Sequence, residues 1–424
     1  MNASLNPEKL FAIIGLWYFT NALPPSISPF EKYLRYSILL IALILLCLHW
    51  KNSLYTASKD KFLWLLSMLA IVSWLWSVSP ETTLLDIRGF LIPMSVFGLY
   101  LATRFSLEEQ CKLLIFGLGI GIFFSLVDFA SDPAAVLNSE TWGGAYGHKQ
   151  NFGSHMTLSF VTLFIIAINT EFYLPTAWVG IAVVSGLILL SGSKSSLIFS
   201  ILMLAILSLY RQYRWRGKLT VLLLDIGILI LGSLITFIVV EWVPLVTSLG
   251  KDPTITGRTV IWSNVIPMIL KQPFLGYGRF GFWSDSGLVA SVFRGKFGAG
   301  VNAYIPPHAH NGAIDLMLDV GMVGAVLFFI SFSTTYFKAL NKAYLSRSLG
   351  DIWPLAFLTF LVLDNITESH LMRLQSVFWV LYIATTLSIR KEEDFRRHLE
   401  KTKQSRRGIK SSREKSPTNI NPQV

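Results

Sequence analysis

Twelve separate apolar runs restrict the fold of this chain more than any other feature of its sequence. A helix that crosses a bilayer needs about 20 predominantly apolar residues, and each run reaches or approaches that length. The first run lacks the basic flank and the A-x-A site of a signal peptide, so we interpret it as a helix. We therefore expect an all-α polytopic membrane protein with about twelve transmembrane helices. The expected spans are residues 10–27, 34–50, 62–77, 87–103, 112–130, 155–170, 172–190, 195–210, 219–243, 310–337, 352–367 and 372–389.

The composition also indicates a membrane protein. Charged residues make up 14% of the 424 residues and hydrophobic residues 53%, whereas soluble domains carry about 25% charged residues. Thirteen Trp and fourteen Tyr suit aromatic belts at two membrane interfaces. The two cysteines, Cys47 and Cys111, lie in or beside apolar runs. This placement excludes a disulfide framework and argues against a structural metal site.

The distribution of basic residues predicts the orientation of the spans. If the N-terminus is cytoplasmic, the Lys/Arg-rich connections all fall on the cytoplasmic side, as the positive-inside rule requires. The stretch from Arg390 onward falls there too and contributes +6 of the net charge of +11. The basic charge therefore indicates topology and attraction to anionic lipid rather than nucleic-acid binding. The basic connections are residues 51–61, 211–218 and 338–350.

The chain divides into two expected parts. Residues 1–390 form a transmembrane domain, and residues 391–424 form a basic cytoplasmic tail that we expect to be disordered. Both termini are then cytoplasmic. One connection, residues 244–309, is much longer than the others and lies between the ninth and tenth spans, on the periplasmic side. Loops of this length in a compact protein are usually functional or disordered.

The long loop contains a helical pattern. Its segment GRTVIWSNVIPMILKQPFLGYGRFGFW places apolar residues at helical spacing. Thr256 is a suitable N-cap, which puts Arg258 in the first turn of a helix. We expect this helix to lie on the outer leaflet or over the mouth of a cavity. Its apolar positions are Ile261, Val265, Met268 and Ile269.

Four cations on the expected periplasmic face oppose the positive-inside bias. If their side chains converge, they can bind a diphosphate through charge-assisted hydrogen bonds. Each also has an ordinary interpretation: a span-end lysine can snorkel, a Gly/Ser turn tolerates charge, and a loop helix has a solvated face. We find no DxD pair, Walker loop or His/Cys metal spacing in the sequence of this face, so we expect neither metal nor cofactor. The four cations are Lys149, Lys194, Arg258 and Arg279.

The stretch HNGAIDLMLDVGMVG begins an apolar run with a histidine and keeps two aspartates within it. We expect His310 to start a helix at the outer mouth of a cavity, where an imidazole can act as a base or orient a substrate. A histidine at a helix start is also a common cap or surface group. Asp315 and Asp319 lie one turn apart, so they either continue a polar lining or brace it through pairs with other helices. We expect Gly321 and Gly324 to permit close helix packing.

Several strings, taken in order, resemble the O-antigen ligase and polysaccharide polymerase superfamily. They are WLWSVSPETTLLDIRG, GHKQNFGS, LSGSKSSL, GRTVIWSNVIPMILKQPFLGYGRFGFW, HAHNGAIDLMLDVGMVG and NITES, which together span roughly residues 72–370. The family signature is His, then Asn, Ser or Gln, nine residues, Gly, two residues, and Gly, Thr or Tyr. It fits His310, Asn311, Gly321 and Gly324 without a gap.

The resemblance implies a twelve-helix envelope enzyme with a large periplasmic loop. Such enzymes transfer a glycan from undecaprenyl pyrophosphate to an acceptor hydroxyl and use neither nucleotide sugar nor metal. Arg258 then resembles the loop arginine that holds the pyrophosphate, and His310 resembles the essential histidine. Ligases often have arginine in the SGS turn, where this chain has Lys194. Together with the HKQN and NITES strings, this difference slightly favours the exopolysaccharide polymerase branch.

We therefore predict an integral inner-membrane glycan transferase whose transmembrane domain is catalytic and whose site faces the periplasm. It polymerises repeat units or ligates a finished glycan onto a glycan, lipid or protein hydroxyl. Its expected partners are the undecaprenyl-pyrophosphate-linked donor, that acceptor and membrane lipids, and no nucleic acid. The predicted catalytic residues are His310 and Arg258, and the predicted substrate-binding residues are Lys149, Lys194, Arg279, His308, Asn311 and Glu368.

A second class of function fits a chain with many spans and intramembrane acids. A secondary transporter or a flippase for lipid-linked glycans has these features as well. We find no repeated halves in the sequence, and a long structured outer loop suits an enzyme better. A transporter places its polar residues near the bilayer midplane, whereas the enzyme places them in an outward-facing cavity under the loop.

Overall fold

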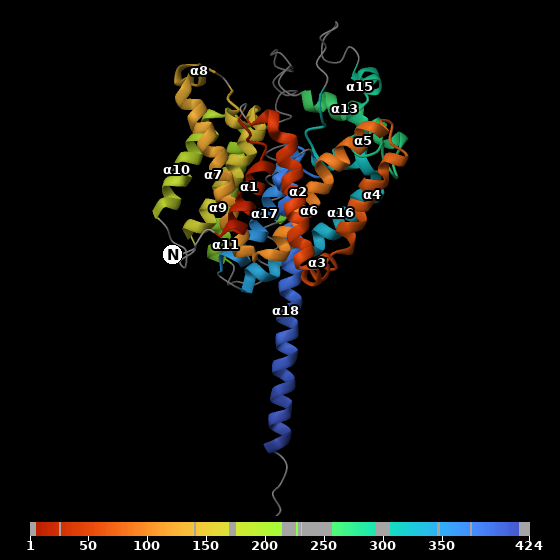
Figure 1. The fold of residues 1–424 in the computed structure, drawn as a ribbon. Helices are drawn as coiled ribbons and strands as arrows, with labels where there is room; N and C mark the ends of the chain where they lie inside the picture. Colours follow the sequence, from red (N-terminus) through yellow and green to blue (C-terminus); the bar gives the residue numbers. More distant parts are fainter. Residues whose placement is uncertain are drawn as a thin grey trace, which may run out of the picture.

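The computed structural model describes residues 6–24, 27–139, 141–168, 175–213, 226–227, 230, 257–293, 306–345, 348–373 and 375–414. Within these ranges the chain is helical and has no strand (Figure 1). This architecture fits a polytopic membrane protein. The helices are α1 (Pro7–Phe19), α2 (Glu31–Leu48), α3 (Trp50–Ala57), α4 (Lys61–Val72), α5 (Pro80–Asp86), α6 (Ile92–Arg104), α7 (Leu107–Ser131), α8 (Pro133–Asn138), α9 (Lys149–Ile168), α10 (Pro175–Leu190), α11 (Lys194–Tyr213), α13 (Gly257–Lys271), α14 (Gly281–Ser284), α15 (Ser286–Phe293), α16 (Gly312–Leu345), α17 (Leu349–Thr367) and α18 (Val377–Glu414).

The helices coincide with the predicted apolar runs. Each run that falls in the described residues overlaps a helix, whereas the ninth run, 219–243, lies almost wholly outside them. By length and hydropathy alone, 4 described helices can cross a membrane, and a pair bent by 101° can form one more span. The count of twelve therefore stays a prediction. The 4 helices are Pro80–Arg104, Leu107–Ser131, Lys149–Ile168 and Gly312–Tyr344, and the bent pair is Ser28–Leu48 with Trp50–Ala57.

Large apolar side chains cover the outside of the helical body. Leu40 of α2, Met68 of α4, Val179 of α10 and Phe329 of α16 are all at least 59% exposed. Soluble monomers rarely expose wide apolar surface. A lipid environment accounts for these outward-facing side chains, because acyl chains solvate them.

The described part of the long loop is folded onto the membrane helices. α13 begins at Gly257, so Arg258 lies in its first turn as predicted. The four apolar positions expected to share a face are buried in one hydrophobic cluster. The expected cap, Thr256, lies outside the described residues. The cluster includes Ile261, Val265, Met268, Ile269, Tyr277, Phe282 and Trp283.

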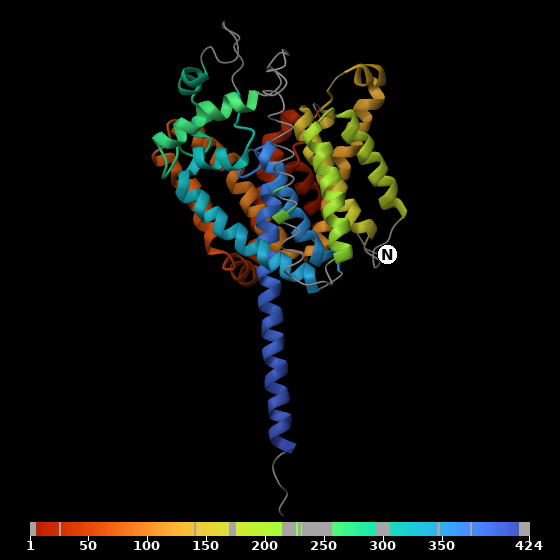
Figure 2. The same ribbon diagram turned by 180° about the vertical axis from the view of Figure 1, so that it is seen from behind.

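α16 is interrupted at Gly321, where the backbone takes φ 64° and ψ −166°. The interruption frees backbone groups that the long loop then uses: Tyr277 donates its N–H to the Leu318 carbonyl, and Met322 donates to the Pro273 carbonyl, both at 2.7 Å. A Cβ at position 321 would lie 2.3 Å from the loop backbone. Gly321 therefore lets a loop dock on a broken helix, which differs from the helix packing expected from the sequence. The two parts of α16, in cyan, run in different directions (Figure 2).

α18 extends well beyond the helical body (Figure 1). It is helical through residues 391–414, and the expected disorder of the tail stays a prediction. Lys, Arg and Glu are good helix formers, and ion pairs fix the helix where it leaves the body. Arg390 pairs with the buried Asp60 at 2.7 Å, and Lys59 pairs with Asp394 at 2.7 Å. The last residues of the chain lie outside the described part.

The cations predicted to lie on opposite sides of the membrane lie at opposite ends of the molecule. Lys59, Lys338 and Lys342 pair with carboxylates of α18, near where that helix leaves the body. Arg258 belongs to α13, at the other end (Figure 1). This separation is what the predicted topology requires. The assignment of the two ends to cytoplasm and periplasm stays a prediction.

Thiol labelling tests that assignment. In a background with Cys47→Ser and Cys111→Ala, which removes both free cysteines, we expect Lys194→Cys to react with an impermeant thiol reagent in intact spheroplasts. Lys194 is exposed at the Arg258 end, and Lys51, exposed at the α3 end, is its control. Lys51→Cys should react only after lysis. The reverse pattern would overturn the orientation.

Candidate active site

A cavity of about 710 Å³ lies among the end of α1, the start of α9, the segment before α16 and the segment that joins α17 to α18. Five of the seven histidines of the chain line it. Aromatic rings, amides and hydroxyls make up most of the remaining wall. The histidines are His148, His155, His308, His310 and His370, and the other lining residues are Thr20, Asn21, Tyr146, Asn151, Phe280, Pro307, Glu368, Ser369, Arg373, Gln375, Ser376 and Phe378.

Strained backbone is concentrated around this cavity. Among the described non-glycine residues, five have a left-handed φ, and four of these line the cavity. Such backbone costs about 1–3 kcal/mol per residue and persists only where the surroundings impose it, which is typical of functional sites. The four are Asn21 (φ 60°), Phe280 (φ 56°), His310 (φ 51°) and Gln375 (φ 45°).

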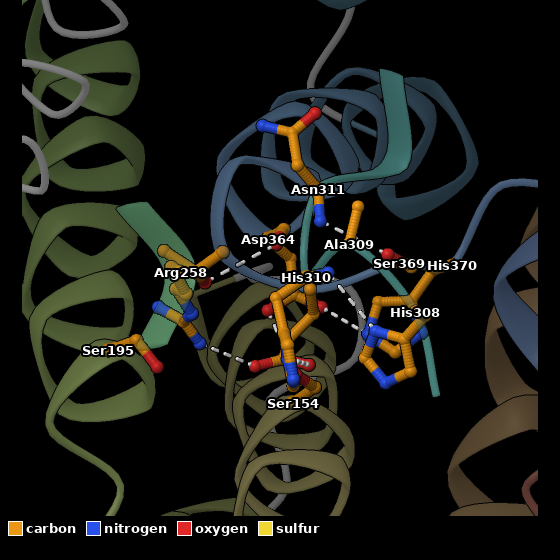
Figure 3. A network of polar contacts seen from close by, with 12 residues as sticks. Ser154, Ser195, Arg258, His308, Ala309, His310, Asn311, Asp364, Ser369 and His370 are labelled. Atoms are coloured by element: carbon orange, nitrogen blue, oxygen red, sulfur yellow. Dashed lines mark hydrogen bonds and ion pairs between the residues drawn. The ribbon is translucent and has the colours of Figure 1, made fainter. Parts of the chain in front are cut away.

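A buried carboxylate joins the predicted arginine to the predicted histidine. Arg258 donates from Nη2 to Oε1 of Glu368 at 2.8 Å, and Nδ1 of His310 lies 3.3 Å from Oε2 of the same carboxylate. Figure 3 shows Arg258 on one side of His310 and His308 on the other. An ionised carboxylate only accepts hydrogen bonds, so Nδ1 of His310 carries the proton. Nε2 of the neutral imidazole then has a free lone pair.

Electrostatics keep this carboxylate ionised. Burial alone raises the pKa of Glu368. The hydrogen bond from His310 and the charge of Arg258 outweigh burial, so the pKa of Glu368 lies below its usual value. The carboxylate is therefore charged at neutral pH and can hold the imidazole in one tautomer.

His308 is fixed in the opposite tautomer. Its Nδ1 accepts the backbone N–H of His310 at 3.1 Å, so the ring proton is on Nε2. Burial lowers the pKa of His308 to about 3. His308 is therefore a neutral N–H donor in the cavity wall.

Asp315 holds the two histidines at the start of α16. Its carboxylate accepts the backbone N–H of Ala309 at 3.2 Å and the indole N–H of Trp283 at 2.7 Å. It also accepts the Ser369 hydroxyl and pairs with Nη2 of Arg373 at 2.7 Å. Of the two expectations for this acid, the structure matches the brace rather than the polar lining.

Asp319 and Arg279 form a second buried brace. Arg279 is fully buried and pairs with Asp86 at 2.9 Å and with Asp319 at 3.1 Å. A buried guanidinium requires such carboxylates. Asp319 also accepts the backbone N–H of Phe280 at 3.1 Å. The structure therefore does not bring Arg279 together with Arg258, and Arg279 does not line the cavity.

The two predicted lysines are the first residues of α9 and α11. Lys149 follows His148, which lines the cavity, and Lys194 is exposed. The starts of the two helices pack closely, since a Cβ on Gly153 would lie 2.1 Å from Oγ of Ser196. Ser195, next to Lys194, lies on the Arg258 side of the network (Figure 3). Helix N-termini favour anions, so this end of the molecule suits a phosphate group.

Asn311 has a local structural role. Its side chain accepts the backbone N–H groups of Ala313 and Ile314 at 3.1 Å each, which makes it the N-cap of α16. It also donates to the Ile366 carbonyl at 3.3 Å. α16 therefore starts at Gly312, whereas the sequence predicted that the helix would start two residues earlier, at His310.

His308, His310 and Glu368 bring ligand atoms within 4.8 Å of one another and so resemble a metal-binding set. The donor chemistry does not fit that use. Nδ1 of His308 is already engaged by a backbone N–H, so its other nitrogen is protonated, and Arg258 occupies the carboxylate. The geometry suits proton handling and hydrogen bonding better than a divalent cation.

Several cavity residues were not among the predicted site residues. Arg373 and His155 lie at the edges of expected spans, and His370 belongs to the polar string DNITESH. Ionisable residues within apolar runs are functional candidates by default. That signal was present in the sequence for His155 and Arg373.

Comparison with known proteins gives two matches. Residues 179–329 match the family model described as O-antigen ligase. The exopolysaccharide production protein ExoQ of Rhizobium meliloti (strain 1021) is 23% identical over 332 residues, which covers 73% of this chain and 74% of the relative. The two matches support the resemblance to the O-antigen ligase and polysaccharide polymerase superfamily seen in the motifs.

Proposed function

We propose that this protein transfers a glycan from undecaprenyl pyrophosphate to an acceptor hydroxyl in a cavity that faces the periplasm, without a metal. The observation that supports it most is the chain from Arg258 through Glu368 to His310, at the wall of a large cavity. A carboxylate that orients a histidine is the usual way to prepare an imidazole base for a hydroxyl substrate. The superfamily and the printed name of ExoQ agree with a role in polysaccharide production.

The reaction needs one proton acceptor and one anion site. The acceptor hydroxyl attacks the anomeric carbon as the bond from that carbon to the diphosphate oxygen breaks. Nε2 of His310 takes the hydroxyl proton, and the diphosphate leaves with the bonding electrons. The proton on His310 then passes to the diphosphate or to water, which restores the neutral imidazole.

The departing diphosphate carries negative charge that the protein must stabilise. Arg258 uses one amino group for Glu368, so its remaining N–H groups can bind phosphate oxygens. Lys149 and Lys194 begin helices whose N-termini also favour anions. The N–H of His308 is a further donor for a phosphate or sugar oxygen.

The alternative class, a transporter or flippase, fits the cavity less well. The wall is built from helix ends: the start of α9, the residues just before α16 and the residues just after α17. A substrate path through a transporter uses the middle of broken helices instead. The placement of the site therefore favours the enzyme.

Within the family, we propose the polymerase branch, on the basis of the Lys194 turn and the similarity to ExoQ. A deletion strain tests this choice. Accumulation of single lipid-linked repeat units with no surface polymer means polymerase. Accumulation of finished lipid-linked polymer that is not joined to its acceptor means ligase.

Substitutions at His310 test the base. We expect His310→Ala to reduce the transfer rate by about 10²–10⁴-fold, the usual value of general-base assistance, in purified protein of normal yield. His310→Gln keeps a hydrogen bond but no base, so activity in Gln and not in Ala would assign a positioning role. His308→Ala is the control and should lose less. Full activity of His310→Ala beside an inactive His308→Ala would show that the wrong histidine was chosen.

Substitutions at Arg258 test the anion site. Arg258→Lys keeps the charge but loses the planar fork, so it cannot bind Glu368 and a phosphate in the same way. We expect partial activity for Arg258→Lys and a larger loss for Arg258→Ala, measured as polymer output at matched protein level. Arg279→Lys is not a suitable control because that side chain is fully buried. Normal polymer output from both Arg258 variants would show that Arg258 has no role in binding the diphosphate.

A further inference from the structure

The cavity contains a second histidine that a carboxylate orients, and the mechanism above does not use it. Asp364, in the last turn of α17, places Oδ2 2.8 Å from Nε2 of His370. Its other oxygen accepts the Ser154 hydroxyl at 2.9 Å. Both Asp364 and Glu368 therefore extend from the end of α17 toward a histidine in the wall of the same cavity.

The Asp364 contact fixes the position of the His370 ring. Oδ2 of Asp364 and Nε2 of His370 lie within ion-pair distance but do not form a hydrogen bond. Among the described residues no partner is found for Nδ1. The rest of the residue is fixed: its backbone N–H donates to Asn365 at 3.0 Å, and its carbonyl accepts from Ser376 at 3.1 Å. His370 therefore presents Nδ1, which accepts a hydrogen bond whenever the ring proton is on Nε2, from a rigid position.

His155 is a second acceptor beside it. Its Nδ1 lies 2.7 Å from the Asn151 carbonyl, which only accepts, so Nδ1 carries the proton. Nε2 of His155 is buried and has no partner in the described chain. The rings of His155 and His370 pack edge to face with centroids 6.5 Å apart. A buried polar atom without a partner costs about 1–3 kcal/mol, so an unpartnered nitrogen in a cavity wall points to a ligand.

Aromatic rings surround the two histidines. Phe378 lies 4.1 Å from the ring of His370 and 5.1 Å from that of His155, between centroids. Tyr146 lies 4.6 Å from His155 on the other side. Flat apolar faces next to fixed hydrogen-bond acceptors suit a sugar ring, which has apolar C–H faces and hydroxyl donors at its edge.

This part of the wall is unsuited to the diphosphate. Arg258 and the lysines at the starts of α9 and α11, which favour anions, belong to the other part of the site. Arg373, the one Lys or Arg among the described lining residues, is already paired with Asp315. The unpartnered Nε2 of His155 and the Asp364 carboxylate behind His370 repel an anion and attract hydroxyl donors. The site therefore has one region for the leaving diphosphate and another for a neutral, hydroxyl-rich group.

We propose that His155 and His370, with Asp364 behind His370, bind hydroxyl groups of the acceptor sugar and so present the reacting hydroxyl to His310. This proposal rests on the proposed function and assigns the acceptor part of the same cavity. Neither histidine takes part in bond making; each acts as a binding and positioning residue.

Direct binding tests the proposal without relying on transfer. The probe is the repeat-unit oligosaccharide released by mild acid from the lipid-linked material of the deletion strain, titrated calorimetrically into the purified full-length protein in nanodiscs. The variants are His155→Phe and the double change Asp364→Asn with His370→Phe, which avoids leaving a buried carboxylate unpaired. Each variant loses one neutral hydrogen bond or more, so we expect affinity to fall on the order of tenfold.

His49→Phe is a matched control. Nδ1 of His49 contacts the carbonyl four residues earlier, at 3.0 Å, as in His155, but His49 does not line the cavity. Its affinity should equal that of the wild type. Unchanged affinity in both cavity variants would overturn the proposal. Loss of Zn²⁺ binding with unchanged oligosaccharide binding would overturn it as well, since the lone pairs would then serve a cation.

Steady-state kinetics separate positioning from a general structural defect. We expect KM for the oligosaccharide acceptor to rise about tenfold in both cavity variants, while KM for the lipid-linked donor and kcat at saturating acceptor stay within about threefold. A structural defect lowers kcat and leaves the KM for the acceptor unchanged, and that result would contradict the proposal.

The two proposals can fail separately. If the wild-type protein binds the oligosaccharide but transfers no glycan, and the cavity variants do not bind it, the proposed function is wrong and the acceptor site is supported. If the wild-type protein transfers the glycan and the cavity variants bind the oligosaccharide normally, only the acceptor site is contradicted. His310→Ala should bind the oligosaccharide normally.

Discussion

The carboxylate of Glu368 is the contact on which the candidate site depends. It connects the long loop, through Arg258 of α13, to the segment before α16, through His310, and it lies at the end of α17. Removing one partner of a buried ion pair typically costs about 3–5 kcal/mol, because the other charge stays uncompensated. The same contact therefore holds the loop on the membrane helices and fixes the imidazole. Folding of the loop and preparation of the base become one event.

The acids inside the apolar run have a related role. Asp315 and Asp319 are buried, and each is neutralised by a guanidinium, Arg373 and Arg279 respectively. Each also accepts a backbone N–H from a segment that forms the cavity wall, at Ala309 and at Phe280. Carboxylates in such a run are costly unless paired. Here they tie irregular wall segments to a rigid helix, and this explains how several left-handed residues are maintained around one cavity.

Local patterns predicted a large part of this arrangement. Hydrophobic runs located the helices, and helical spacing located α13 and put Arg258 in its first turn. The motif His-Asn with its two glycines identified His310. Sequence patterns could not predict which distant segments pair with one another. Arg279 and Arg258 are both loop arginines, and only the fold shows that one is neutralised in the interior. Gly321 likewise has the sequence context of helix packing, but its backbone conformation depends on a loop more than forty residues earlier.

The same limit applies to the contact between His370 and Asp364 and to the tail, residues 391–414. His370 gains its orientation from Asp364, and His155 becomes its neighbour only when α9 packs beside α17. Residues 391–414 have the composition of a disordered segment, but they also contain many good helix formers and continue α18. Composition alone does not distinguish a solvated helix from a disordered tail.

Nitrogen-15 NMR of the histidine rings tests the central claim most directly, since it reports which imidazole nitrogen carries the proton. With histidine-labelled protein, and the His310 signals assigned by their loss in His310→Gln, we expect His310 at neutral pH to be protonated on Nδ1 and unprotonated on Nε2. Glu368→Ala removes the acceptor and should shift the population toward the Nε2–H tautomer. A wild-type His310 already protonated on Nε2, or one unaffected by Glu368→Ala, would contradict the account.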